Sequence, residues 1–148
     1  MTGDGPRPLL IGWKERLDFP GWGIRRVKAK VDTGARTSAL DAVSYELYHA
    51  GDGGLCIRLR LALQRKRHLG ELRVVEVPVL RMVVVRNSGG QHEQRPLIEA
   101  EVVLGPVRKR VLLTVTNRAG MRFRVILGRL ALADDFVVDV SKKYLLRS

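Results

Sequence analysis

The 148-residue sequence contains little cysteine, histidine or aromatic side chain: one Cys, three His, and 5% Phe, Trp and Tyr together. Cys56 cannot form a disulfide within the chain, and in LCIRLRL it alternates with other side chains as a strand residue does, which predicts a buried thiol. The histidines His49, His68 and His92 are far apart, whereas a zinc site needs about three protein ligands, so no metal or other cofactor is predicted. The scarcity of aromatic rings argues against base stacking and against nucleic acid as a partner.

A long hydrophobic run is also missing. No stretch approaches the roughly 20 apolar residues of a membrane-spanning helix, and the apolar part of MTGDGPRPLLIG is too short for a signal peptide. We therefore expect a cytoplasmic protein that does not enter a membrane. Acidic residues are outnumbered: 27 Lys and Arg against 15 Asp and Glu give a net charge of +12. This excess attracts polyanions, and an acidic peptide, a ribosomal surface and nucleic acid all fit it.

Short segments with a period of two dominate the chain and predict a mostly β protein. Residues 1–8 form an expected flexible tail, and residues 9–148 a single domain. Helix signals are few: Ser38–Tyr48 and Gly128–Asp135 are the two short helices predicted. The predicted strands are Leu9–Leu17, Gly23–Val31, Leu55–Leu63, Glu71–Val79, Met82–Arg86, Pro96–Leu104, Val107–Thr116 and Arg122–Leu127, with an extended Phe136–Val140 near the end.

The stretch VDTGA places one carboxylate, Asp32, directly after a predicted strand. Thr33 offers a hydroxyl that can fix a loop, and Gly34 permits backbone geometry that other residues avoid. Asp and Gly are also ordinary turn residues, so the motif alone is weak. A second segment, VILGR, runs from an apolar strand into Gly128 and a short helical stretch, and this pairing of motifs strengthens the first.

Three segments in order make the pattern more specific: IGWKERLDFPGWGIRRVKAKVDTGARTSAL, VVVRNSGGQHEQRPLI and LTVTNRAGMRFRVILGRLALADDFVVDVSKKYLL. From about Leu10 to Leu146 the chain resembles the bacterial retropepsin-like aspartic peptidases usually labelled ATP-dependent zinc proteases, a family associated with ATP-grasp glutamate ligases. The resemblance implies a retropepsin-like closed β-barrel with one or two short helices. It also implies that Asp32, Thr33 and Gly34 form the catalytic loop, and that Leu127, Gly128 and Arg129 support it from behind.

Aspartic peptidases use two carboxylates that share one proton, because two negative charges so close cannot both persist. The chain has one DTG sequence, and its other aspartates lack that context. We therefore expect a homodimer in which Asp32 of each copy contributes one carboxylate to a site on the two-fold axis. The expected activity is that of an aspartic endopeptidase, which hydrolyses peptide bonds without a cofactor.

Substrate contacts are expected from Ala35 and Arg36 and from a flap hairpin within Val83–Ile98, whose tip is Asn87, Ser88, Gly89 and Gly90. An ordinary surface hairpin explains the same tip residues. Viral retropepsins usually carry an acidic residue where this chain has Arg36. An arginine there could receive a substrate carboxylate, so an acidic, Glu-rich peptide is the predicted substrate.

The residues do not support the zinc and ATP parts of the family label. The sequence HEQRP begins like an HExxH zinc helix but has Pro96 in place of the second histidine, and no phosphate-binding GxxxxGK[ST] loop occurs. Any ATP dependence would have to come from a partner such as a glutamate ligase.

Two alternatives to a peptidase remain. One is a non-catalytic basic β-barrel that binds an acidic protein, the ribosome or RNA through Arg65–His68 and Arg108–Arg110. The other is a degenerate retropepsin that keeps the fold as a dimerisation or adaptor unit.

Overall fold

The computed structural model describes residues 7–63, 72–86, 89–117 and 122–146, and most of these residues lie in β-strands. The expected tail, residues 1–8, therefore lies mostly outside the described residues. The elements in chain order are β1 Leu9–Ile11, β2 Lys14–Phe19, the 3₁₀ turn η1 Pro20–Trp22, β3 Ile24–Val31, β4 Ser38–Asp41, β5 Ser44–His49, β6 Leu55–Leu61, β7 Arg73–Pro78, β8 Arg81–Arg86, β9 His92–Leu104, β10 Val107–Thr116, β11 Val125–Leu127, α1 Arg129–Leu132 and β12 Phe136–Val138.

A closed barrel of six strands, in the order β10, β4, β11, β3, β2 and β9, forms the body of the protein. It closes because β10 pairs in parallel with β4 on one side and antiparallel with β9 on the other. Alternate side chains of these strands point into the barrel; on β3 these are Val27, Ala29 and Val31, all buried. Burial of such apolar faces is the main force that holds a small barrel together. The closed β-barrel expected from the family resemblance is confirmed.

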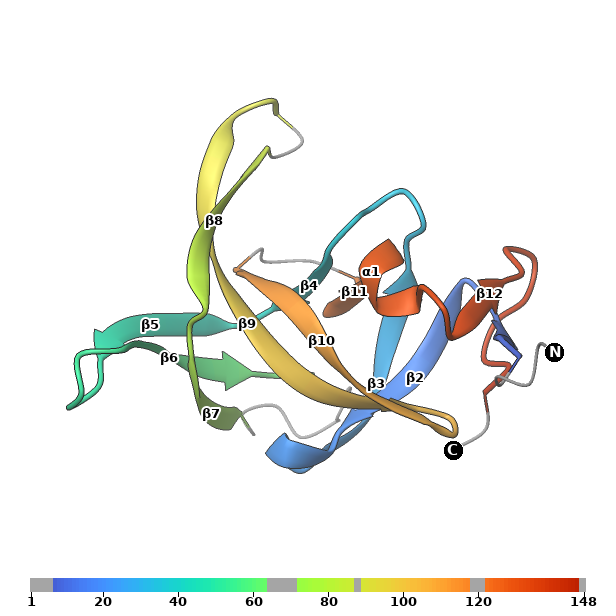
Figure 1. Ribbon diagram of the computed structural model, residues 1–148, viewed down its shortest axis with the longest axis horizontal. Helices are drawn as coiled ribbons and strands as arrows, with labels where there is room; N and C mark the ends of the chain where they lie inside the picture. Colours follow the sequence, from blue (N-terminus) through green and yellow to red (C-terminus); the bar gives the residue numbers. More distant parts are fainter. Residues whose placement is uncertain (1–6, 64–71, 87–88, 118–121, 147–148) are drawn as a thin grey trace, which may run out of the picture.

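Three elements extend from the barrel (Figure 1). The β8–β9 hairpin projects upward, the sheet β5–β6–β7 lies to one side, and the short parallel pair β1–β12 lies on the opposite side. Within the described residues, no helix has the length and apolar character needed to cross a membrane.

Most predicted strands are present, but three local expectations were wrong. Ser38–Tyr48 is not a helix: it forms β4 and β5, because β4 is hydrogen-bonded between β10 and β11. Leu9–Leu17 is broken between β1 and β2, where Gly12 packs against the Lys142 backbone and has no room for a side chain. Cys56 is half-buried, because on β6 it alternates with the buried Ile57 and lies on the same face as Arg58. The predicted helix Gly128–Asp135 is confirmed in shorter form, as the four-residue α1.

A buried carboxylate attaches the C-terminal segment to the barrel. Glu15 on β2 is fully buried and accepts hydrogen bonds from the backbone N–H groups of Gly12 (2.8 Å), Leu145 (2.8 Å) and Leu146 (3.1 Å). No cation within the described ranges forms an ion pair with it. Because a buried polar group needs partners, this carboxylate and the segment that ends at Leu146 stabilise each other.

We predict that Glu15→Ala lowers the free energy of unfolding by about 3 kcal/mol or more, because three backbone N–H groups lose their acceptor. Urea unfolding followed by circular dichroism measures the change. Glu101→Ala is the matched control: Glu101 forms a partly exposed ion pair with Arg108, so its loss should cost about 1 kcal/mol or less. Equal losses in the two variants would contradict this role for Glu15.

Candidate active site

Asp32 lies where three strands meet. It follows β3 directly, and its backbone N–H donates to the Leu127 carbonyl of β11 at 2.8 Å. Strand β11 runs between β3, to which it is parallel, and β4, to which it is antiparallel. Two segments about 90 residues apart in sequence are thus side by side at the loop that joins β3 to β4, as the VDTGA and VILGR motifs predicted.

The loop holds the carboxylate of Asp32 in place. Asp32 is half-buried, and its Oδ1 accepts a hydrogen bond from the Gly34 N–H at 3.0 Å, while its carbonyl accepts one from the Ala35 N–H at 3.1 Å. The second carboxylate oxygen has no hydrogen-bond partner among the residues that the structure describes. This arrangement leaves one fixed oxygen and one oxygen that is available to a water, a substrate or a second carboxylate.

Backbone hydrogen bonds join the loop to the segment behind it. The N–H groups of Arg129 and Leu130 donate to the carbonyls of Ala35 (2.8 Å) and Arg36 (3.0 Å). The Arg129 guanidinium also donates to the Thr33 carbonyl at 3.0 Å. Free N–H groups at the start of a helix need acceptors, and here the loop supplies them. Leu127, Gly128 and Arg129 therefore lie directly behind the loop.

Ser38 also contributes to this contact, although no sequence motif indicated it. Its buried hydroxyl accepts a hydrogen bond from the Gly128 N–H at 3.0 Å, and its carbonyl accepts one from the Thr114 hydroxyl at 3.3 Å. The hydroxyl of Thr33, which the sequence suggested as the group that fixes the loop, is exposed and has no partner in the described part of the chain. The Thr33 carbonyl, and not its hydroxyl, forms a bond to the supporting segment, because it accepts from the Arg129 guanidinium.

Gly128 is required by close packing. A Cβ at this position would lie 2.6 Å from the Thr37 carbonyl oxygen and 2.9 Å from the Ala35 carbonyl oxygen. Both are backbone atoms, so neither can move aside without moving the loop that carries Asp32. The absence of a side chain at Gly128 therefore sets the distance between the loop and its support.

We predict that Gly128→Ala lowers the free energy of unfolding by about 2 kcal/mol or more and reduces any Asp32-dependent activity, because the loop must shift. Gly21→Ala is the matched control, since a Cβ there meets nothing within 4 Å. Thermal unfolding of both variants measures the difference. Similar stabilities would show that the close contact at Gly128 does not constrain the loop.

Of the predicted substrate-contacting residues that the structure describes, Ala35 is half-buried and Arg36 is exposed. Within the described ranges, the Arg36 guanidinium has no ion-pair partner. The β8–β9 hairpin exists, with Arg86 opposite His92, and in Figure 1 it rises on the same side of the barrel as the β3–β4 loop. Asn87 and Ser88 lie outside the described residues, while Gly89 and Gly90 are exposed. The role of this hairpin as a flap stays a prediction.

Other aspartates are engaged away from Asp32. Asp41 is buried, accepts a 2.7 Å hydrogen bond from Arg124 and is also bonded to Thr116. Asp135 pairs with Lys109, and Asp139 accepts two bonds from Ser141. Across the described residues, no group of three or more His, Cys, Asp and Glu side chains is placed to hold a metal ion.

Comparisons with known proteins agree with this geometry. A family model described as RimB-like, retropepsin-like aspartic endopeptidase RimB, matches residues 10–148. The chain is 35% identical to a probable alpha-L-glutamate ligase of Parasynechococcus marenigrum, over 90% of this chain and 28% of that protein. It is 33% identical to one of Shewanella pealeana, over 93% of this chain and 30% of that protein. The chain thus spans less than a third of these curated relatives.

A crystal structure of a Legionella pneumophila protein of unknown function shares the fold, with a TM-score of 0.76 and 21% identity over 94% of this chain and 98% of that one.

Proposed function

The chain belongs to the RimB-like family of retropepsin-like aspartic endopeptidases, and from this premise we propose that it is a homodimeric aspartic endopeptidase in which Asp32 of each copy supplies one catalytic carboxylate. The observation that carries the proposal is the Asp32 loop, where Gly34 holds one carboxylate oxygen and the other has no partner among the described residues. A carboxylate held in this way is prepared to share a proton with a second one.

The chemistry follows from that shared proton. The ionised carboxylate accepts a proton from a water, and the oxygen of that water attacks the scissile carbonyl carbon. The protonated carboxylate donates a hydrogen bond to the carbonyl oxygen and stabilises the negative charge that develops there. Proton transfer to the leaving nitrogen then allows the C–N bond to break, which yields a carboxylic acid and an amine.

The proposal of a second copy rests on the single DTG sequence and on the positions of three other aspartates. Asp41, Asp135 and Asp139 are held by Arg124, Lys109 and Ser141, so none of these three is free to complete a pair with Asp32. A two-fold axis beside the loop brings a second Asp32 to the site. Leu130, which follows the supporting segment and is 51% exposed, is an apolar side chain that such a contact would cover.

We predict that Asp32→Asn reduces peptide cleavage by about a thousandfold or more, because an amide cannot take a proton from water. Cleavage of a fluorogenic peptide library measures activity, and sedimentation measures assembly. The variant should stay folded and dimeric, since its amide oxygen can still accept the Gly34 N–H. Undiminished cleavage would exclude Asp32 as the base, and a dimer that cleaves no peptide would favour the adaptor alternative.

Mixing the wild-type protein with the Asp32→Asn variant tests whether the site is shared between two subunits. Subunits exchanged at equal concentrations form mixed dimers with a single carboxylate, so the wild-type protein should lose about half of its activity. A site built within one chain would keep all of it.

An acidic peptide is the proposed substrate. Arg36 follows the catalytic loop, is exposed and has no ion-pair partner in the described part of the chain, so its guanidinium can bind a carboxylate through two hydrogen bonds. The relatives named probable alpha-L-glutamate ligase contain a segment like this chain within a protein more than three times as long. We therefore propose a functional link to a glutamate ligase, whose product would be Glu-rich.

We expect a Glu-rich peptide to be cleaved faster than an Ala-rich one of equal length, and Arg36→Ala to reduce this preference by about tenfold, because one charge-assisted contact is lost. The ratio of the kcat/KM values for the Glu-rich and Ala-rich peptides measures the preference in each variant. Thr37→Ala, at the neighbouring exposed position, is the control. Equal rates for the two peptides would count against an acidic substrate.

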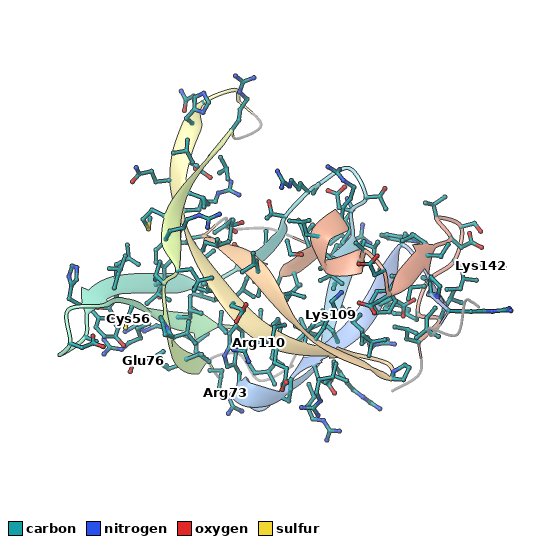
Figure 2. The ribbon with its side chains drawn as sticks, viewed as in Figure 1. Cys56, Arg73, Glu76, Lys109, Arg110 and Lys142 are labelled. Carbon is teal, nitrogen blue, oxygen red and sulfur yellow. The ribbon has the colours of Figure 1, made fainter. Side chains whose placement is uncertain are left out.

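The binding-module alternative has lost part of its support. Its basic run Arg108, Lys109 and Arg110 is paired with Glu101, Asp135 and Glu99. Figure 2 shows Lys109 and Arg110 on β10, over the body of the barrel. The other run, Arg65–His68, lies outside the described residues.

A further inference from the structure

A second group of cations remains uncompensated on the outer face of β2 and β3. Every second residue of the two strands is buried: on β2 these are Glu15 and Leu17, and on β3 they are Val27, Ala29 and Val31. The residues between them therefore point outward. We call these cations and their neighbours the basic face: Lys14, Arg16, Lys28, Lys30, Arg122 and Lys143. None of the six has an ion-pair partner among the described residues.

The register of the two strands sets like charges against each other. Lys14 lies directly opposite Lys30. Arg16 lies directly opposite Lys28. Side chains at such positions have Cβ atoms about 5 Å apart, and like charges there are destabilising. A barrel that needed only stability would have opposite charges in these positions, so the face is better explained by a ligand that carries negative charge.

Aromatic rings hold one end of the basic face. The Lys14 ammonium lies 4.7 Å from the Trp13 ring centre and 5.3 Å from that of Tyr144, and Arg16 lies 4.0 Å above Tyr144. Phe123 packs edge to face against Trp13. Burial lowers the pKa of Lys14, and the charges of neighbouring cations lower it further: Lys143, Arg122 and Arg16. These rings support cations, and a ring with a cation on its face is a poor platform for a nucleic-acid base.

The basic face ends at the catalytic loop. The Val31 N–H donates to the Trp13 carbonyl at 2.8 Å, which joins the end of β3 to the start of β2. Lys28 and Lys30 alternate with buried residues, and Asp32 is the next position in the same alternation. At the other end of the face Asp18 accepts a bond from the Arg26 N–H. A ligand lying along Lys28 and Lys30 is therefore directed toward Asp32.

From these observations we infer that the basic face is an anion-binding surface that holds an acidic peptide in extended conformation and leads it to Asp32. Outward side chains on a strand recur about every 6.6 Å, and an extended peptide presents its own side chains at the same interval. Alternate carboxylates of the peptide thus match Lys28 and Lys30 in register. The inference rests on the proposed function, because it assumes that the bound peptide continues into the Asp32 site.

The test measures binding without catalysis. The parent protein is the full chain with Asp32→Asn, and the probes are a fluorescein-labelled oligoglutamate, an oligoalanine of equal length and a single-stranded oligouridylate. Lys28→Gln with Lys30→Gln removes two charges from the basic face and keeps the side-chain stems. Arg108→Gln with Arg110→Gln removes the same charge from the paired run on β10. Fluorescence anisotropy at constant salt gives each Kd.

We expect the lysine double variant to raise the Kd for oligoglutamate by at least about tenfold and the arginine double variant to change it by less than about twofold. Oligoalanine should not bind. The melting temperature of the lysine double variant should equal or exceed that of the parent, because repulsion is relieved. A lower melting temperature would mean that the lysines serve stability instead.

Three results would overturn the inference: no binding of oligoglutamate by the parent, equal loss in both double variants, or tighter lysine-dependent binding of the RNA. The last would identify a nucleic-acid surface. Because the parent lacks the Asp32 base, these results do not depend on peptidase activity. A wild-type chain that binds oligoglutamate through the basic face but cleaves nothing would refute the proposed function and leave the binding surface in place.

Discussion

The close contact between Gly128 and the loop after β3 is the constraint on which the candidate site depends. Parallel pairing of β11 with β3 brings the two segments together, and the Gly128 backbone then lies against the Ala35 and Thr37 carbonyls with no room for a Cβ. Five hydrogen bonds, four from backbone N–H groups and one from the Arg129 side chain, join Asp32–Ser38 to the segment Leu127–Leu130. The position of Asp32 is thus set by backbone atoms, which are the least variable part of a fold.

The parts of the fold that the sequence could predict are those determined locally. A period of two and turn residues such as Gly105 with Pro106 mark the strands and hairpins, since both depend on residues close in sequence. The Asp32 loop was recognisable for the same reason, because Asp32, Thr33 and Gly34 are consecutive. The supporting segment was recognisable only through the family pattern, since its pairing with β3 joins residues 96 positions apart, such as Val125 and Ala29.

What the sequence could not predict depends on register and long-range pairing. Ser38–Asp41 became a strand because β10 and β11 bond it on both sides, and neither neighbour is visible from the local pattern. Glu15 gives no sign in KERLDF that its partners are the N–H groups of Leu145 and Leu146. Likewise, β2 and β3 both read as alternating basic strands, but only their register shows that Lys14 and Lys30 are directly opposite.

The distribution of paired charges separates two basic regions that look alike in sequence. Arg108–Arg110 is the denser run, yet Glu99, Glu101 and Asp135 neutralise it, so it adds little to the field that an approaching anion meets. The cations of the basic face have no such partners among the described residues, and four of them lie in two adjacent rows on β2 and β3, the strand that Asp32 follows. An anion bound as proposed would relieve the repulsion between those rows, and this relief would add to its affinity. Under the proposed function, the same cations would favour the ionised form of a Glu-rich peptide and would hold that peptide beside Asp32, where it would be cut.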